Sequence, residues 1–326
     1  MNKASINETT WSGVPALRLS GCGAHEWSAL LVPSLGGNLI SLVVDGRELL
    51  RTPPDAEAVR AKPARWGIPI LLPPNRIAKG RFRFNDREYQ LEINSGDNHS
   101  HGFILRRPCA VAESRVDGDA AAVTITFRAA DYPEVMAQFP HPFIFTITYR
   151  LNGERLHCTT QIANEGSEPM PFGLGFHHYL AAPDDGTNRY LIRLTPAQKW
   201  EISPDLLPTG RFTTPEGPLD LSTWQPLHAV RRDGGYRLTT READGWSRFE
   251  LKDQTTGQLL TMRAGPEYGH WVIFNGTPGF EGFICPEPYT CMTNAFNLDL
   301  PGEVSGMAVV APGEHRPAGE WELIWS

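Results

Sequence analysis

The strongest constraint on the fold is an alternation of apolar and polar side chains with a period of two residues. In residues 143–151 (FIFTITYRL) large apolar side chains take every second position, and residues 122–128 (AVTITFR) repeat the pattern. Successive side chains of a β-strand point to opposite faces, so this period predicts half-buried strands. The chain offers no long stretch with a helical period. We therefore expect an all-β fold built as a large antiparallel β-sandwich.

Turn signals are frequent along the whole chain. Residues 81–91 (RFRFNDREYQL) and residues 248–263 each place two strand-like runs around a short polar turn, which predicts two hairpins. The 31 glycines and 28 prolines are spread over the full length instead of gathering in one linker, so we expect a single domain over residues 1–326. Residues 51–65 show neither period and are predicted to form a mobile surface loop.

Composition and charge exclude several classes of protein. The 326 residues are 40% hydrophobic, which is enough to bury a large core. The net charge is -7 and Lys and Arg form no run, so a nucleic-acid partner is not expected. The first residues lack the apolar core of a signal peptide, and no apolar run reaches membrane-spanning length. We therefore expect a cytoplasmic protein without a membrane partner.

The cysteines and paired histidines give no metal pattern. The five cysteines are scattered and contain no C-x-x-C pair, which fits neither a disulfide framework nor a structural zinc site. His99 and His101 are two residues apart and could share a strand face, but this spacing matches no zinc motif. We expect reduced cysteines and no bound metal.

Three short segments hold imidazole and carboxyl groups in unusual surroundings. They are residues 98–103 (NHSHGF) with His101, residues 175–179 (GFHHY) with His177, and residues 286–290 (PEPYT) with Glu287. The two prolines beside Glu287 fix the backbone on either side. A carboxylate and a histidine on opposite sides of one substrate can take a proton from one oxygen and give a proton to another. These side chains are therefore candidates for acid-base catalysis of an isomerisation.

These segments, with two earlier ones, resemble the motifs of the aldose 1-epimerase (galactose mutarotase) family. In chain order they are residues 36–49 (GGNLISLVVDGREL), 74–82 (PNRIAKGRF), 100–103 (SHGF), 172–179 (FGLGFHHY) and 287–297, which begin with Glu-Pro and contain two asparagines. Each motif alone is weak. Five motifs in the right order, spread over nearly the whole chain, make the resemblance specific.

The resemblance implies a galactose mutarotase-like sandwich and a cofactor-independent isomerase that interconverts the α and β anomers of an aldohexose such as glucose or galactose. It assigns Glu287 as the general base at the anomeric hydroxyl and His177 as the general acid at the ring oxygen. Histidine suits the acid role because its ordinary pKa lies near neutrality. His101 and Arg76 correspond to groups that hold the sugar, and Asn75 is a further hydrogen-bonding candidate. A small sugar is the implied partner, and the choice between monomer and dimer stays open.

Two further candidates have competing interpretations. The family usually has an aspartate three residues before a Phe or Tyr, and Asp233 precedes Tyr236 by three. Asp233-Gly234 is equally an ordinary tight-turn dipeptide. Trp66 lies near the arginine motif and is a candidate for the aromatic face that packs on the C–H side of a pyranose, with a place in the core as the alternative.

Three other functions compete with anomer interconversion of a simple aldose. A mutarotase for a phosphorylated or rarer sugar would add a cationic pocket, for which Arg65, Arg81 and Arg106 are candidates. A non-catalytic carbohydrate-binding sandwich would explain the aromatic residues but has no use for an acid-base pair. A glycosidase with two carboxylates is less favoured, because only one acid falls in a strong motif.

Overall fold

The structure, a computed structural model, describes residues 3–183, 188–230 and 234–326. Strands dominate these residues, and the longest α-helices span only six residues. All paired strands run antiparallel within the described ranges, which confirms the predicted all-β class. No helix among the described residues is long and apolar enough to cross a membrane.

Three large sheets form the framework. A five-stranded sheet contains β1 (Ser5–Trp11), β2 (Val14–Cys22), β3 (Glu26–Val32), β4 (Asn38–Val44) and β5 (Arg47–Glu48). A nine-stranded sheet has the order β11 (Ala110–Asp117), β12 (Ala120–Arg128), β13 (Phe143–Leu151), β14 (Arg155–Asn164), β28 (His315–Trp325), β24 (Leu259–Ala264), β23 (Ser247–Asp253), β18 (Tyr190–Leu194) and β21 (Gln225–Pro226). An eight-stranded sheet contains β20 (Pro208–Thr213), β19 (Ala197–Ile202), β22 (Gly234–Leu238), β25 (His270–Phe274), β26 (Phe283–Tyr289), β16 (Gly175–Phe176) and β6 (Ile70–Leu71), with β17 (Leu180–Ala181) also paired to β26.

Short ribbons and helices complete the chain. The two-stranded ribbons are β7 (Arg76–Ile77) with β10 (His99–Ser100), β8 (Arg81–Phe84) with β9 (Arg87–Gln90), and β15 (Met170–Phe172) with β27 (Ala308–Val310). The α-helices are α1 (Ala56–Ala61), α2 (Pro133–Gln138) and α3 (Gly302–Ser305). The 3-10 turns are η1 (Pro63–Arg65), η2 (Ala78–Gly80), η3 (Ala129–Asp131), η4 (Gly217–Leu219), η5 (Leu227–Ala229) and η6 (Ala295–Asn297).

The strands and hairpins expected from the two-residue period are confirmed. Residues 143–151 form β13, residues 122–128 fall in β12, and the predicted hairpins are β8–β9 and β23–β24. The loop predicted for residues 51–65 is wrong in part, because α1 and η1 occupy most of it. Asp55 caps α1 by accepting a hydrogen bond from the Ala58 amide, and Val59 is buried. One capping residue and one apolar contact per turn suffice for a helix this short, and they leave no long periodic pattern to detect.

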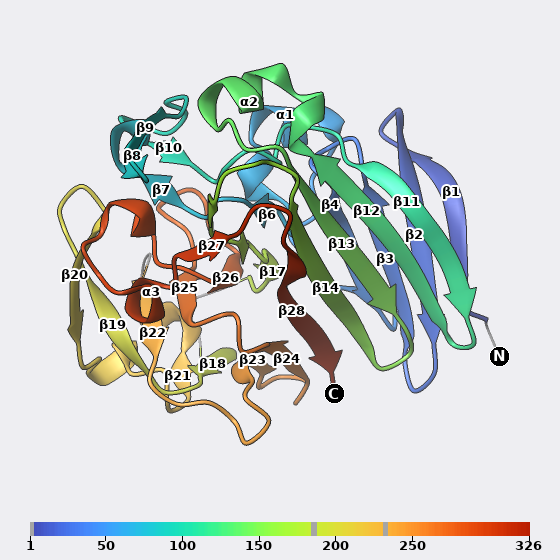
Figure 1. Ribbon diagram of the computed structural model, residues 1–326. Helices are drawn as coiled ribbons and strands as arrows, with labels where there is room; N and C mark the ends of the chain where they lie inside the picture. Colours follow the sequence, from blue (N-terminus) through green and yellow to red (C-terminus); the bar gives the residue numbers. More distant parts are fainter. Residues whose placement is uncertain (1–2, 184–187, 231–233) are drawn as a thin grey trace.

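The five-stranded sheet packs on one half of the nine-stranded sheet. In Figure 1 the blue strands β1–β4 lie against the green strands β11–β14, while β19, β20 and β22 lie on the opposite side of the molecule. Trp27 and Leu31 from one layer share a core with Ile125, Phe145 and Ile147 from the other. Burying these large side chains between two sheets is the main stabilising contribution to the fold.

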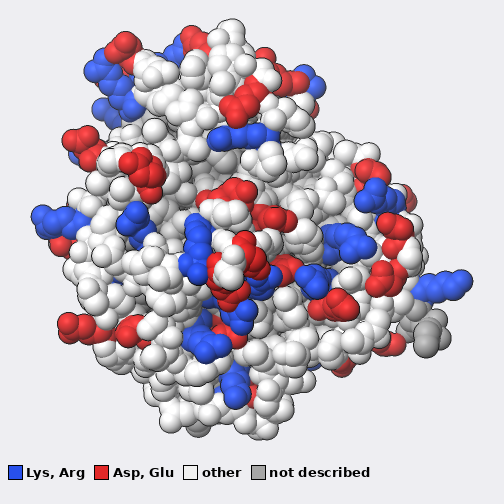
Figure 2. All heavy atoms as spheres, turned by 60° about the horizontal axis from the view of Figure 1, so that its bottom comes forward, with Lys and Arg blue, Asp and Glu red and all other residues white. Residues whose placement is uncertain are grey.

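Charged side chains on the nine-stranded sheet are arranged in pairs across neighbouring strands. Arg155 of β14 and Arg263 of β24 both contact Glu322 of β28, at 2.8 and 2.9 Å. On the face that Figure 2 shows, positive and negative side chains lie next to one another, without a large area of one sign. This face therefore does not present the basic surface that binding a phosphate backbone requires.

Candidate active site

The site is built on β26 and on the extended segment that runs antiparallel beside it, residues 175–181. Two strand pairings fix the register of this segment: Gly175 lies opposite Tyr289, and Leu180 lies opposite Ile284. Counting inward from either pairing places His177 opposite Glu287. Residues directly opposite each other in an antiparallel pair have neighbouring side chains on the same face. The acid and base candidates are thus cross-strand neighbours.

The side chains of His177 and Glu287 are in contact. The Nε2 atom of His177 lies 3.3 Å from the Oε1 atom of Glu287. The two residues are 5% and 1% exposed, so the contact is almost completely screened from bulk water. A buried carboxylate and imidazole at this distance can share or exchange a proton.

Two prolines remove backbone hydrogen-bond donors from β26 on either side of Glu287. Pro286 and Pro288 flank Glu287 and lack the amide N–H groups that a strand uses to bond its neighbour. On the opposite edge of β26 the pairing with β25 is continuous from His270 to Phe274. The segment that carries His177 instead bonds to residues 67–69 on its far side, through the His177 amide and the Pro69 carbonyl at 3.0 Å. Glu287 is therefore held by one continuous ladder and His177 by another.

Alternation along the segment separates His177 from its neighbours. Phe176 and His178 point to the nine-stranded sheet, where both rings make edge contacts with Trp321 of β28. Their centroids lie 5.5 and 4.5 Å from that ring. His177 points to the other face. His178 is thus part of the core between two sheets and does not face the site.

Tyr289 fixes the orientation of the Glu287 carboxyl group. It is two residues further along β26, so it shares the face of Glu287, and its hydroxyl donates a hydrogen bond to Oε2 at 2.5 Å. The Asn75 amide donates to the same hydroxyl at 3.4 Å. Gly175 lies opposite Tyr289, and a Cβ atom there would lie only 2.4 Å from the tyrosine ring. The glycine is needed because the ring occupies its side-chain space.

Tyr179 has the corresponding role beside His177. The two rings are stacked, with centroids 4.4 Å apart and planes 3° from parallel. The tyrosine hydroxyl donates to the Ala64 carbonyl at 2.7 Å and lies 3.4 Å from the His177 Nε2 atom. The stack holds the imidazole plane so that Nε2 faces Glu287.

The ribbon β7–β10 brings His101 and Arg76 to the same place. The ring centroid of His101 lies 5.7 Å from that of His177. Asn75 and His101 both have positive φ angles, 55° and 67°, and the His101 amide donates to the Asn75 carbonyl at 2.9 Å. The Asn75 side-chain oxygen accepts from the Arg76 guanidinium at 3.2 Å. Two residues in a conformation that costs non-glycine side chains energy mark a functional site in many proteins.

Burial controls the protonation of the histidines in this region. Desolvation holds the pKa of His177 well below its ordinary value, and the neighbouring His101 and His178 act in the same direction. Burial, aided by the charge of Arg76, lowers the pKa of His101 to about 3. His101 is therefore neutral at physiological pH in the free protein, whereas His177 must hold a proton when it acts as an acid.

These buried histidines predict a loss of stability in mild acid. Burial lowers the pKa of His101, His178 and His270 to about 3 and that of His141 to about 4. In the unfolded chain each titrates near 6.5, so below that pH the unfolded state binds protons that the folded state does not. We expect the free energy of unfolding to fall by roughly 1 kcal/mol per pH unit for each such histidine as the pH drops below about 6.5. Urea titrations followed by tryptophan fluorescence at pH values of about 7.5, 6.5 and 5.5, which bracket the ordinary pKa of histidine, measure the free energy of unfolding. A urea midpoint that is the same at all three pH values would contradict this prediction.

The remaining two candidates are Trp66, which lies at the edge of the site, and Asp233. Trp66 has the guanidinium of Arg51 over one ring face, 3.7 Å from the centroid, and it packs beside α1. The Arg51 amide bonds to the Tyr179 carbonyl, which links this pair to the His177 stack. Asp233 lies outside the described residues. Five of the seven candidates therefore meet in one connected cluster: Asn75, Arg76, His101, His177 and Glu287.

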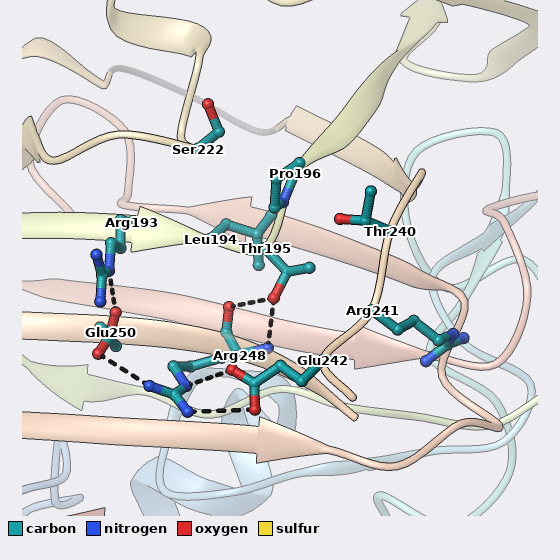
Figure 3. Close-up of a pocket in the computed structure, with 10 residues that line it drawn as sticks. All are labelled: Arg193, Leu194, Thr195, Pro196, Ser222, Thr240, Arg241, Glu242, Arg248 and Glu250. Carbon is teal, nitrogen blue, oxygen red and sulfur yellow. Dashed lines mark hydrogen bonds and ion pairs between the residues drawn. The ribbon is translucent and has the colours of Figure 1, made fainter. Parts of the chain in front are cut away.

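A second polar cavity lies on the nine-stranded sheet, away from β26. It measures about 240 Å³ and its floor carries Arg193, Arg248, Glu242 and Glu250 (Figure 3). Arg193 pairs with Glu250, and the Arg248 Nε atom lies 2.8 Å from Glu242. These two arginines and two glutamates therefore balance one another's charge.

The contact between His177 and Glu287 suits a reaction at two oxygens of one carbon atom. Two oxygens bonded to the same carbon are close together, so an acid and a base that serve them must be close to each other as well. When the imidazole is protonated and the carboxyl group is ionised, the imidazole can give its proton to one oxygen while the carboxylate takes a proton from the other. No group of three His, Cys, Asp or Glu side chains placed to hold a metal ion occurs in the described part of the chain.

A known protein family matches most of the chain. A family model described as aldose 1-epimerase matches residues 25–319. The chain belongs to the aldose 1-epimerase family. This confirms the resemblance drawn from the five motifs.

Relatives of this aldose 1-epimerase family member are distant in sequence and near in fold. The uncharacterized protein YihR of Escherichia coli is 25% identical over 283 residues, which cover 85% of each chain. The galactose mutarotase of Mus musculus is 25% identical over 275 residues, covering 80% of this chain and 76% of the mouse protein. A galactose mutarotase-like protein from Clostridium acetobutylicum, 28% identical, superimposes with a TM-score of 0.91 over 99% of both chains. The predicted galactose mutarotase-like sandwich is confirmed.

Two residues of the site, Tyr289 and Tyr179, were not predicted from the sequence. Each lies two residues beyond a candidate catalytic residue of this family member, Glu287 or His177. In an extended segment that spacing places a side chain on the same face as the catalytic one. The two-residue spacing is visible in the sequence, but it indicates a shared face only if both segments are extended.

Proposed function

We propose that this aldose 1-epimerase family member interconverts the α and β anomers of an aldohexose such as glucose or galactose by acid-base ring opening and closure. The observation that carries the proposal is the buried contact between His177 Nε2 and Glu287 Oε1. Ring opening needs a base at the anomeric hydroxyl and an acid at the ring oxygen. Both oxygens are bonded to C1, so the base and the acid must lie close together. The galactose mutarotases among the relatives support this choice of reaction.

In the proposed mechanism the Glu287 carboxylate removes the proton of the anomeric hydroxyl while His177, protonated in the complex beside that carboxylate, gives its proton to the ring oxygen and becomes neutral. The C1–O5 bond breaks and an open-chain aldehyde forms. Rotation about C1–C2 presents the other face of the aldehyde, and the same two groups in reversed roles close the ring to the other anomer. Because these steps transfer protons and no electrons, the chain needs no redox cofactor for them.

The residues around the pair offer hydrogen bonds to the sugar oxygens. Arg76 offers a planar guanidinium to sugar oxygens, and neutral His101 can donate to or accept from a hydroxyl. Asn75 orients Arg76 and Tyr289 through its two ends. Trp66 stays a candidate for the wall of the sugar pocket, as does Asp233 for a sugar contact.

Polarimetry tests the proposed function directly. Freshly dissolved α-glucose and α-galactose are expected to reach anomeric equilibrium faster with the protein than without it. A non-catalytic sugar-binding sandwich would bind these sugars and leave the rate of optical change as it is in buffer. If neither sugar, nor any other common aldose, equilibrates faster, the proposal is wrong.

Replacement of Tyr289 by phenylalanine is expected to lower kcat by about 10- to 100-fold, since a hydrogen bond to a charged group contributes roughly 1.5–3 kcal/mol. The hydroxyl donates to the Glu287 carboxylate and favours its charged, basic form. We also expect the acidic limb of the pH–rate profile to move to higher pH, which a purely structural defect would not cause.

Tyr132→Phe is the matched control for this variant. The Tyr132 hydroxyl donates to the Pro108 carbonyl, apart from the site, so the same chemical change there should leave the profile in place. An acidic limb at the same pH in Tyr289→Phe and in the unmodified protein would remove Tyr289 from its orienting role.

A further inference from the structure

A cavity of about 180 Å³ opens beside His101, and four cationic side chains are among the residues that line it. Lys62, Arg65, Arg106 and Arg107 line it, with His101 at one wall. Lys62 and Arg65 come from the end of α1 and from η1, and the two other arginines follow the 100–103 motif. In Figure 1 α1 and β10 lie at the same end of the molecule, so these segments converge although they are distant in sequence.

The positive charge of this cavity is only partly balanced. Arg107 pairs with Glu134 of α2 at 2.8 Å, and Glu92 is the single carboxylate among the described lining residues. Lys62, Arg65 and Arg106 form no ion pair with a described carboxylate within 4.0 Å. Arg106 donates to the Arg60 carbonyl at 3.1 Å, and Arg65 lies over the Phe280 ring at 4.4 Å. All three side chains are exposed, and together they give this cavity a positive charge that a bound anion would balance.

The cavity is joined to the catalytic pair on two sides. His101 lines it and lies next to His177, with ring centroids 5.7 Å apart. Ala64 also lines it, and its carbonyl accepts the hydrogen bond from Tyr179, the ring stacked on His177. The cavity therefore lies close to His177, with His101 between them on one side and Tyr179 and Ala64 between them on the other.

We infer that this chain prefers an aldose that carries an anionic substituent away from the anomeric carbon, and that Lys62, Arg65 and Arg106 bind the anion. This inference rests on the proposed anomer interconversion and specifies its substrate class. Phosphate and carboxylate share the required chemistry, since both accept several hydrogen bonds from guanidinium and ammonium groups. Arg81, the third arginine expected at such a pocket, bonds to Gln90 in the β8–β9 ribbon and does not line the cavity.

The test compares three sugars by exchange NMR between the α and β anomeric protons, which requires no pure anomer. Glucose, glucose 6-phosphate and glucuronate serve as probes, each corrected for its spontaneous rate. We expect kcat/KM for at least one anionic sugar to exceed that for glucose tenfold or more, and to fall as ionic strength rises. Whichever of the phosphate and carboxylate sugars gives the larger value identifies the anion.

Two variants locate the anion within the molecule. In Arg106→Met and Arg65→Met we expect the ratio of kcat/KM for the favoured anionic sugar to that for glucose to fall at least tenfold. Arg83→Met is the matched control, because it removes an equal charge from an exposed strand position paired with Asp86. The ratio should stay the same in that control.

The possible failures are distinguishable. If glucose is converted as fast as both anionic sugars, or faster, the inference on substrate class is wrong while the proposed function stands. If no sugar is converted, the proposed function fails and the inference fails with it. An anionic preference that survives both cavity variants would place the anion elsewhere and overturn the assignment of this cavity.

Discussion

Glu287→Gln is expected to lower kcat for anomer interconversion by about 10²–10⁴-fold, the usual cost of losing a general base. Glutamine has nearly the same shape as glutamate, and its oxygen can still accept the hydrogen bond from Tyr289. It cannot take a proton from the anomeric hydroxyl at any pH at which the protein is folded. Polarimetry or exchange NMR with the sugar that the unmodified protein converts best measures the loss.

The contrast between chemistry and binding makes this experiment decisive. We expect sugar affinity, measured by titration calorimetry, to change much less than kcat, and the midpoint of thermal unfolding to stay close to that of the unmodified protein. Glu303→Gln is the matched control, since Glu303 is exposed on α3. A kcat within threefold of the unmodified value would exclude Glu287 as the base, because general-base loss costs about 10²-fold or more.

His177→Asn is expected to lower kcat by a similar factor of about 10²–10⁴. Asparagine retains a polar group in place of Nδ1 but loses the Nε2 atom that faces Glu287. It also removes the ring that stacks on Tyr179. The same rate assays measure the effect, and His315→Asn, at an exposed position of β28, is the control.

A double variant shows whether the two groups act as one unit. If His177 and Glu287 transfer protons in a single concerted exchange, losing both should cost little more than losing the more important one. Effects that multiply would mean that each group contributes independently of the other. That result would contradict a concerted transfer by the pair and leave the separate roles of base and acid intact.

The class of fold and most of the cluster were accessible from the sequence. The two-residue period of β12 and β13 identified strands because each of them has one face in the core and one face away from it. Strand β26 shows no such period, since all of its residues are buried. It was found through its motif instead, and the same is true of the segment around His177.

What the sequence left undetermined depends on contacts between distant segments. The register that sets His177 opposite Glu287 involves residues more than a hundred positions apart, and nothing local specifies it. The cation cavity combines the end of α1 with residues 106–107, and only two of the three arginines proposed for such a pocket take part. The arginine of the β8–β9 hairpin has an equally basic sequence context, so charge pattern alone could not separate it from the other two.

The position of the catalytic pair on adjacent strands restricts how this chain can diverge. A strand tolerates replacement of many side chains, but inserting or deleting one residue turns every following side chain to the opposite face. One such event between Gly175 and Leu180, or between Ile284 and Tyr289, would leave the imidazole and the carboxyl facing different layers. The two segments are thus constrained in length far more than in composition, which allows a fold like this one to persist at 28% identity.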